Sequence, residues 1–419
     1  MTTILALIFV LGVLVFVHEL GHFLAARSVG VRVERFSIGF PPRLLTFIPT
    51  EKGWVFKLFF YRRIEDGKLE WGPVLEKTLK KIPRKATETE FNVALIPLGG
   101  YVKLAGTIDE SLDDEITGAP DELTSKNRLQ QAWVMSAGVI MNLILAVLVY
   151  TGVSWSQGVD VPINDEPVVG VVVETLLQIN PETGKPIINP ETDKPMMIEG
   201  PASKAGLRPG DRIVSIDAIE INSWNQMTSL IHSRPGDSLS ITWSREGFQD
   251  DTTASIVPIV AGKDVCDCRV IDLGMIGIAP ITEHQENDVF SALAYGFSIT
   301  QGNVDKIYNS VCALVSGNAP FSDLGGPILI AQLAGKSARA GFLSLILFTA
   351  FISVNLAFVN ILPIPGLDGG HLLIILLEGI SRREFSVKTR IRIQQVGMAI
   401  LMLLIVSVLY NDIARLISG

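Results

Sequence analysis

Long uncharged stretches alternate with polar segments along this chain of 419 residues. Four stretches are apolar for about 20 residues, the length that an α-helix needs to cross about 30 Å of hydrocarbon. The third stretch contains Pro363 and Pro365, which predict that its helix breaks after Leu362. The pattern predicts a polytopic α-helical membrane protein with four transmembrane helices, at residues 1–27, 132–157, 341–380 and 390–415.

The segment between the second and third apolar stretches has the shorter pattern of a soluble domain. Its β-branched runs, two Pro-Gly-Asp turns and short helical pattern predict an inserted α+β domain at residues 165–280. The near-identical octapeptides INPETGKP and INPETDKP lie within it, and their turn-rich composition predicts a hairpin insertion at residues 177–199. Residues 281–340 follow as an amphipathic linker, which would lie on the outer membrane surface or pack on the α+β domain.

Residues 28–131, between the first two apolar stretches, are more than a loop. Short strand-like runs broken by Gly and Pro, among them FSIGFPPRLLTFIP and FNVALIPLGGYVKLAG, predict β-hairpins. Because unpaired backbone groups cannot face lipid, a hairpin at membrane depth must be covered by protein or line a wet cavity. We expect a membrane-associated β-hairpin region, followed by a solvated acidic loop at residues 107–131.

Composition and charge agree with a membrane protein. Hydrophobic residues make up 48% of the chain and charged residues 19%, below the roughly 25% of soluble proteins. Basic residues cluster after the first span, within residues 27–35, and between the third and fourth spans, within residues 382–392. The positive-inside rule therefore places both clusters in the cytoplasm and the α+β domain outside. The net charge of −8 and the lack of a basic stripe predict no nucleic-acid partner.

The three cysteines, Cys266, Cys268 and Cys312, fit no zinc-finger spacing. A bridge between Cys266 and Cys268 would be strained because so few residues separate them. We expect free thiols with no assigned role.

His18, Glu19 and His22 are the strongest chemical signal, a His-Glu-x-x-His pattern near the end of the first span. Residues four apart lie on one face of a helix, so both imidazoles can bind one Zn²⁺ while Glu19 accepts a proton from the attacking water. The alternative is a pair of buried polar residues that hydrogen-bond between helices. Since ionisable groups inside a membrane are costly unless they pair or bind a metal, we favour the metal site.

A catalytic zinc usually has three protein ligands. His232 and His284 lie in the segment that we expect outside the membrane, whereas Asp368 lies at the cytoplasmic end of the third span, in FVNILPIPGLDGGH. A broken helix at membrane depth is tolerated where it lines a cavity, which suits a metal site. We therefore expect His18, His22 and Asp368 to bind Zn²⁺.

HELGH in a first span and NILPIPGLDG at the end of a third resemble the site-2 protease family of intramembrane zinc metalloproteases, in its bacterial branch of the regulator-of-sigma-E protease type. FSIGF, IPLGGYVKLAG, SAGVIMN and GGPILIAQLAG resemble the same family in order and spacing, over nearly the whole chain. The α+β domain resembles its extracytoplasmic PDZ domain, with room here for one such module. Gly138-Val139 stands where family members often have Gly-Pro.

The resemblance implies the same zinc ligands and makes Glu19 the general base. It implies that Asn360 holds the substrate or its developing oxyanion, a role that an amide donor can fill. It also implies that three residues of the hairpin region pair with an unwound substrate strand by β-addition: Gly99, Gly100 and Tyr101.

The implied function is hydrolysis of peptide bonds in the transmembrane segments of single-span proteins, such as anti-sigma factors or remnant signal peptides. The implied location is the bacterial inner membrane, with the active site toward the cytoplasm and a peptide or substrate ectodomain at the PDZ-like domain.

Two alternative functions remain. A membrane metal transporter would also carry His and Asp, although spans two and four offer almost no polar path. A non-catalytic PDZ chaperone would not need Glu19.

Overall fold

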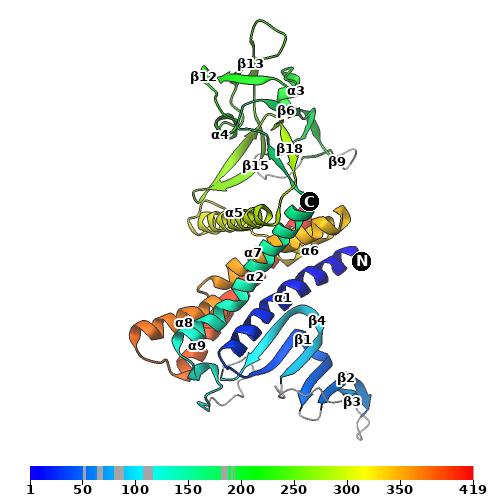
Figure 1. Cartoon of the computed structure of the whole chain (residues 1–419), viewed down its shortest axis with the longest axis vertical. Coiled ribbons are helices and arrows are strands. Elements are labelled where there is room, and N and C mark those ends of the chain that lie inside the picture. The colour runs from blue at the N-terminus through cyan, green and yellow to red at the C-terminus, as the bar shows by residue number, and fades with distance from the viewer. Residues whose placement is uncertain are drawn as a thin grey trace. The chain divides into compact units, whose positions relative to one another are not determined.

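The computed structural model describes residues 1–50, 53–63, 69–79, 89–106, 117–180, 187–189, 192 and 194–418. The chain forms two compact units (Figure 1). The first unit comprises Met1–Gly152, Leu293–Val304 and Ser322–Gly419, and the second comprises Val153–Ala292 and Asp305–Phe321.

Four helices are long and apolar enough to span a membrane, which confirms the four predicted spans. They are α1 (Thr2–Ser28), α2 (Arg128–Gln157), α7 (Phe342–Ile361) and α9 (Val387–Ser418). Two shorter helices flank α7, namely α6 (Pro327–Ala340) and α8 (Asp368–Ser381). The chain is therefore a membrane protein built largely on this helical frame.

The connection between α7 and α8 turns the chain sharply. Helix α7 ends at Ile361, as the two prolines that follow predict. Gly369 and Gly370 let α8 begin tightly against the end of α7, because a Cβ on either would overlap backbone atoms of residues 361–365. Asp368 is thereby fixed as the first residue of α8.

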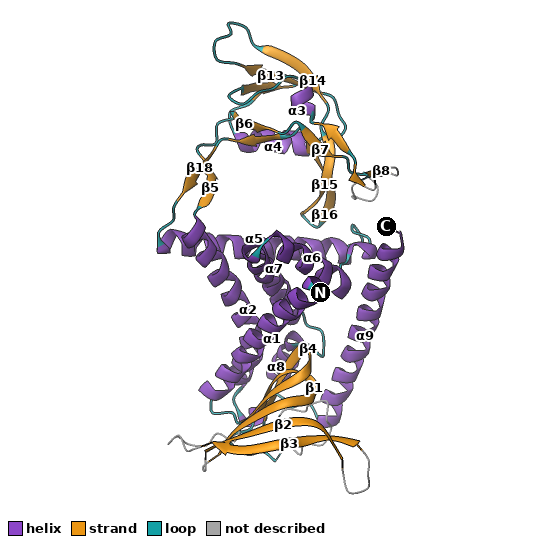
Figure 2. Cartoon of the chain, turned by 90° about the vertical axis from the view of Figure 1, so that its right-hand side faces the viewer, coloured by secondary structure: helices purple, strands orange, loops and turns teal. Residues whose placement is uncertain are grey.

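A four-stranded sheet follows α1 in the chain, with the order β3-β2-β1-β4 (Figure 2). Its strands are β1 (Val33–Thr50), β2 (Gly53–Arg63), β3 (Leu69–Leu79) and β4 (Glu90–Leu104). Strands β1 and β4 interleave, since residues 35–38 pair both with residues 100–103 and with residues 90–93, while residues 43–47 pair with residues 91–94. Residues 100–104 therefore form an outer strand of the described sheet, next to α1. Residues 107–116 of the predicted acidic loop, which leads to a short 3-10 helix at Leu123–Ser125, lie outside the described residues.

Two buried carboxylates tie the ends of α9 to other helices. Glu378 of α8 lies 2.6 Å from Nη1 of Arg128 on α2 and 2.7 Å from Nη2 of Arg390 on α9. Asp412 of α9 accepts hydrogen bonds from three backbone N–H groups at the start of α6, those of Gly326, Ile328 and Leu329. Because both carboxylates are buried and paired, removal of a partner would leave an uncompensated charge and destabilise these helix contacts.

The second unit is an α+β fold around a core that includes Ile213, Met227 and Trp243. Its main sheet has the order β12-β11-β13-β14. These strands are β11 (Arg212–Ile216), β12 (Ile219–Glu220), β13 (Leu239–Ser244) and β14 (Thr252–Ile256), with helices α3 (Pro201–Lys204) and α4 (Trp224–His232).

The remaining strands of this unit form two-stranded ribbons. They pair β5 (Val159–Pro162) with β18 (Thr282–Gln285), β6 (Val169–Val172) with β17 (Ile278–Pro280), β7 (Thr175–Leu177) with β10 (Met197–Glu199), β8 (Ile188–Asn189) with β9 (Lys194–Pro195), and β15 (Ile259–Cys266) with β16 (Arg269–Met275). Of the predicted insertion at residues 177–199, residues 181–186, 190, 191 and 193 lie outside the described residues.

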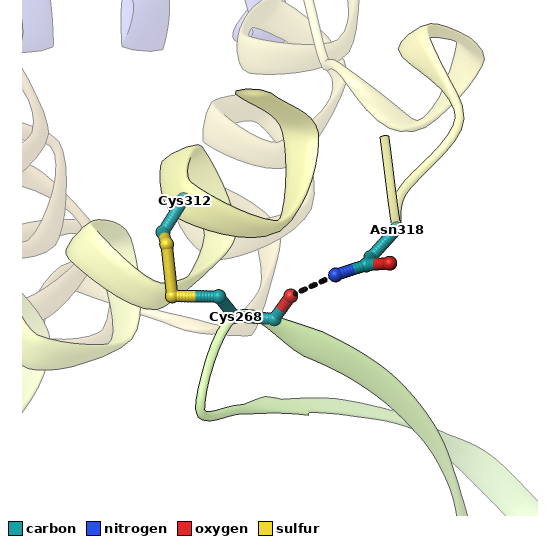
Figure 3. Close-up of a disulfide and its surroundings, with 3 residues drawn as sticks. All are labelled: Cys268, Cys312 and Asn318. Atoms are coloured by element: carbon teal, nitrogen blue, oxygen red, sulfur yellow. Dashed lines mark hydrogen bonds between the residues drawn. A yellow bond between two sulfur atoms is a disulfide. The ribbon is translucent and has the colours of Figure 1, made fainter. Parts of the chain in front are cut away.

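The expectation of free thiols is wrong for two of the three cysteines, because Cys268 and Cys312 form a disulfide (Figure 3). Cys268 lies in the turn between β15 and β16, and Cys312 lies in the last turn of α5 (Val289–Val315). Asn318 Nδ2 donates a hydrogen bond to the Cys268 carbonyl at 2.8 Å. The two cysteines are 44 residues apart, so only the fold brings the hairpin turn to the helix.

Loss of this disulfide is expected to destabilise the second unit. A closed loop of 44 residues corresponds to about 4 kcal/mol in the chain-entropy model. Cys268→Ser should therefore lower the thermal unfolding temperature of the purified protein, while Cys266→Ser, which leaves both partners in place, should not. Peptide mapping without reductant checks the pairing, and recovery of Cys268 and Cys312 as free thiols from non-reduced protein would contradict it.

Candidate metal centre

His18, His22 and Asp368 converge at one point among the membrane-spanning helices. His18 Nε2 lies 3.1 Å from Asp368 Oδ2, His22 Nε2 lies 3.4 Å from the same oxygen, and the two Nε2 atoms are 3.2 Å apart. Both histidines are buried, and Oδ2 of Asp368 is buried without a hydrogen-bond partner. The structure thus brings together the three residues that the sequence predicts as ligands.

Glycines let α1 and α2 approach closely at this point. A Cβ on Gly21 of α1 would overlap the carbonyl of Ala137. A Cβ on Gly138 of α2 would lie 2.5 Å from His18 Cε1 and 2.5 Å from His22 Nε2. Gly138 therefore leaves the space that the imidazoles and any ion between them require. Helix α2 runs through Gly138-Val139 without a break, so a proline at position 139 is not needed for this approach.

Each imidazole is oriented by a contact at its Nδ1 atom, on the side of the ring away from Asp368. His22 Nδ1 donates a hydrogen bond to the backbone carbonyl of Val134 at 2.8 Å, which leaves Nε2 as the lone-pair nitrogen. His18 Nδ1 lies 3.3 Å from the side-chain amide of Asn142. Both rings therefore present Nε2 to Asp368, in the orientation that a shared metal requires.

Glu19 of α1, the residue after His18, faces the outer strand of the sheet. A Cβ on Gly100 would lie 3.5 Å from Glu19 Cγ and within 2.7 Å of Val15 Cγ1, so β4 passes directly against α1. The predicted general base is therefore next to the predicted substrate-binding strand.

Of the remaining predicted site residues, Asn360 contacts a predicted metal ligand, whereas Gly99 and Tyr101 contact other residues of the sheet. Asn360 Nδ2, near the end of α7, lies 3.4 Å from His18 Nε2. Gly99 packs on the ring of Phe40, where a Cβ would overlap it. The Tyr101 hydroxyl accepts a hydrogen bond from Arg35 at 3.3 Å, so its side chain is directed to Arg35 and only its backbone is available to the site.

The donor set fits zinc. Ligand atoms at about 2.0–2.1 Å from a tetrahedral ion are about 3.3 Å from one another, and the three separations here are 3.1, 3.2 and 3.4 Å. Two imidazole nitrogens and one carboxylate oxygen are typical of catalytic zinc, which keeps its fourth position for water or substrate. The fold and the site define a membrane-embedded metalloenzyme.

Comparison with known proteins identifies the family. The chain matches the model of Peptidase family M50 over residues 6–70 and 60–404, and it belongs to this family. It is 28% identical to zinc metalloprotease RasP of Oceanobacillus iheyensis, with 99% of this chain and 100% of that protein aligned. It is 27% identical to zinc metalloprotease RasP of Shouchella clausii over the full length of both. The protein is therefore a zinc metallopeptidase of the site-2 protease type, which excludes the non-enzymatic alternatives.

Sequence reasoning missed two residues that face the metal centre, Gly138 and Asn142. In the sequence, Gly138 differs from the family pattern only through the Val139 that follows it, and Asn142 is the last residue of SAGVIMN and has no predicted role. The signal that would have found them is spacing, because Val134, Gly138 and Asn142 repeat every four residues, as do His18 and His22. Two helices with matching four-residue intervals can pack face to face.

Gly138→Ala is expected to impair zinc binding, because its Cβ would lie 2.5 Å from a ligand nitrogen. Overpacking of this kind costs about 1–3 kcal/mol, so zinc affinity should fall at least about fivefold. Gly152→Ala is the matched control, since a Cβ there has no atom within 4 Å. Competition with a chelator measures the zinc affinity of the purified proteins, and equal affinity in Gly138→Ala and wild type would refute this packing.

Proposed function

We propose that the protein hydrolyses peptide bonds in the transmembrane segments of single-span membrane proteins, such as anti-sigma factors or remnant signal peptides. The observation that carries this proposal is the depth of the catalytic set, because His18 and His22 lie on a span that is apolar enough to cross a bilayer. Asp368 meets them from the first residue of α8, shortly after the span α7. A water activated at that depth can attack only a chain that enters the membrane. Bound zinc would supply the charge that polarises the scissile carbonyl and acidifies the attacking water.

Each residue at the site has one role in this proposal. His18, His22 and Asp368 hold the ion. Glu19 accepts the proton of the attacking water and returns it to the leaving amine. Asn360 is suited to hydrogen-bond the substrate carbonyl as charge develops on its oxygen, because its amide is 3.4 Å from His18 Nε2.

The outer strand at residues 100–104 is suited to hold an unwound substrate. A helical substrate hides its carbonyls in its own hydrogen bonds, so it must become extended before hydrolysis. Gly100 faces Glu19, and the neighbouring Gly99 packs on Phe40, so neither position carries a side chain that would block this strand. A substrate strand added here would lie beside the general base.

The proposed location is the bacterial inner membrane, with the metal centre toward the cytoplasm and the second unit outside. The two basic clusters support this orientation by the positive-inside rule. The disulfide of the second unit supports it independently, because disulfides persist in extracytoplasmic compartments and are rare in the cytosol.

The second unit is proposed to be a PDZ-like domain that binds a peptide or the ectodomain of the substrate. A pocket of about 160 Å³ lies between α4 and the end of β16, lined by residues that include Thr228, Ile231, His232 and Ile278. Gly277 has φ +85°, a conformation that side-chain-bearing residues rarely adopt, and it bends the chain into β17 along the pocket. PDZ domains bind an extended peptide between such a strand and helix.

Glu19→Gln tests the mechanism. Loss of the general base should lower cleavage of a single-span model substrate at least about 100-fold, while zinc content stays at the wild-type level. Glu220→Gln, a change of the same kind at an exposed position on β12, is the matched control. The measurement is cleavage in proteoliposomes together with metal analysis. Equal cleavage by Glu19→Gln and wild type would exclude the proposed mechanism.

Thr228→Trp tests the pocket, because the larger side chain would fill it. Binding of a labelled peptide with a free carboxyl terminus to the full-length protein should weaken at least about tenfold, or about 1.4 kcal/mol. Ser229→Trp adds the same side chain at an exposed position of α4 that does not line the pocket. Fluorescence anisotropy checks the prediction, which fails if both variants bind the peptide alike.

A further inference from the structure

Three positions of α2 face the two histidines of α1 at matching intervals. Val134 accepts the hydrogen bond of His22 Nδ1, and the amide of Asn142 lies 3.3 Å from His18 Nδ1. Gly138 lies between them and contacts both rings. Each imidazole therefore has Nδ1 toward α2 and Nε2 toward Asp368.

A neutral imidazole carries one N–H donor and one lone pair. When Nε2 gives its lone pair to a metal, Nδ1 carries the proton and needs an acceptor. We propose that Asn142 is a positioning residue that supplies this acceptor to His18, as the Val134 carbonyl does to His22. This role rests on the zinc site of the proposed function and explains why α2, which contributes no ligand, contacts both histidines.

The amide of Asn142 must present its oxygen for this purpose. Its Oδ1 is buried without a hydrogen-bond partner, while Nδ2 is the atom nearest His18 Nδ1. A half-turn about the last side-chain bond exchanges the two atoms without moving the residue. Oδ1 then accepts the Nδ1 proton. The unexchanged amide would donate to Nδ1, which would place the proton on Nε2 and remove His18 from the ligand set.

Asn142 is held firmly enough to act in this way. The residue is 0% exposed, so its side chain has no freedom to leave the contact. Its backbone carbonyl accepts a hydrogen bond from Ser353 Oγ of α7 at 2.8 Å. Helix α7 also carries Asn360 and leads to Asp368, so the same contact joins both halves of the metal centre.

Three substitutions at this position separate hydrogen bonding from packing. Asn142→Asp keeps an acceptor oxygen and should retain the zinc affinity of the wild type. Asn142→Ala shortens the side chain and Asn142→Leu keeps its branched shape, and each should weaken zinc binding about 10–100-fold through loss of the acceptor. Zinc affinity is measured on the full-length protein in detergent by competition with a chelator, and the absorption of bound Co²⁺ reports the change at His18.

Asn355→Leu of α7 is the matched control, because its amide donates to Phe351 of its own helix, and it should bind zinc like the wild type. Wild-type affinity in folded Asn142→Ala or Asn142→Leu would overturn the inference. An equal loss in Asn142→Asp would overturn it too, because the acceptor would then be irrelevant. In both cases the wild type still binds zinc, whereas a wild type that binds none contradicts the proposed function itself.

Discussion

Two buried imidazoles and a half-buried carboxylate among apolar helices are the constraint on which the rest of this structure depends. Such groups are strongly destabilising in a membrane unless every proton and lone pair has a partner. Here the outward nitrogen of His22 is bonded to a backbone carbonyl, and Asp368 faces both inward nitrogens within 3.4 Å. One divalent ion would accept the remaining lone pairs, and the proposed metal site would in this way make the burial tolerable.

The elements around the site follow from bringing these groups together. Gly21 and Gly138 allow the crossing of α1 and α2, and the paired glycines after Asp368 allow α8 to start against α7. The buried Glu378 at the other end of α8 is bonded to α2 and α9, so Asp368 belongs to a helix fixed at both ends. Glycines at the close helix contacts and ion pairs at the helix ends thus together hold Asp368 in position.

The sequence predicted the four spans and placed His18 and His22 on one helix face because both features depend on local patterns. Hydropathy over about 20 residues defines a span, and four-residue spacing defines a metal-binding helix face. The disulfide and the role of α2 were not predictable in this way. Cys268 and Cys312 are 44 residues apart, and Gly138 matters only through the rings of another helix. The interleaving of β1 and β4 likewise depends on pairings between residues about 50 apart or more, which no local pattern encodes.

That interleaving also decides where the sheet can change in length. The first half of β1 is paired on both sides by β4, and the first half of β4 is paired by both halves of β1. An insertion or deletion in either of these two segments would break the register of two neighbours at once. The hairpin of β2 and β3 joins the rest of the sheet only where β2 pairs with the second half of β1. A change in the length of this hairpin would therefore leave the strand beside Glu19 undisturbed. Variation among relatives should therefore concentrate in β2 and β3 and spare the strands that touch the catalytic helix.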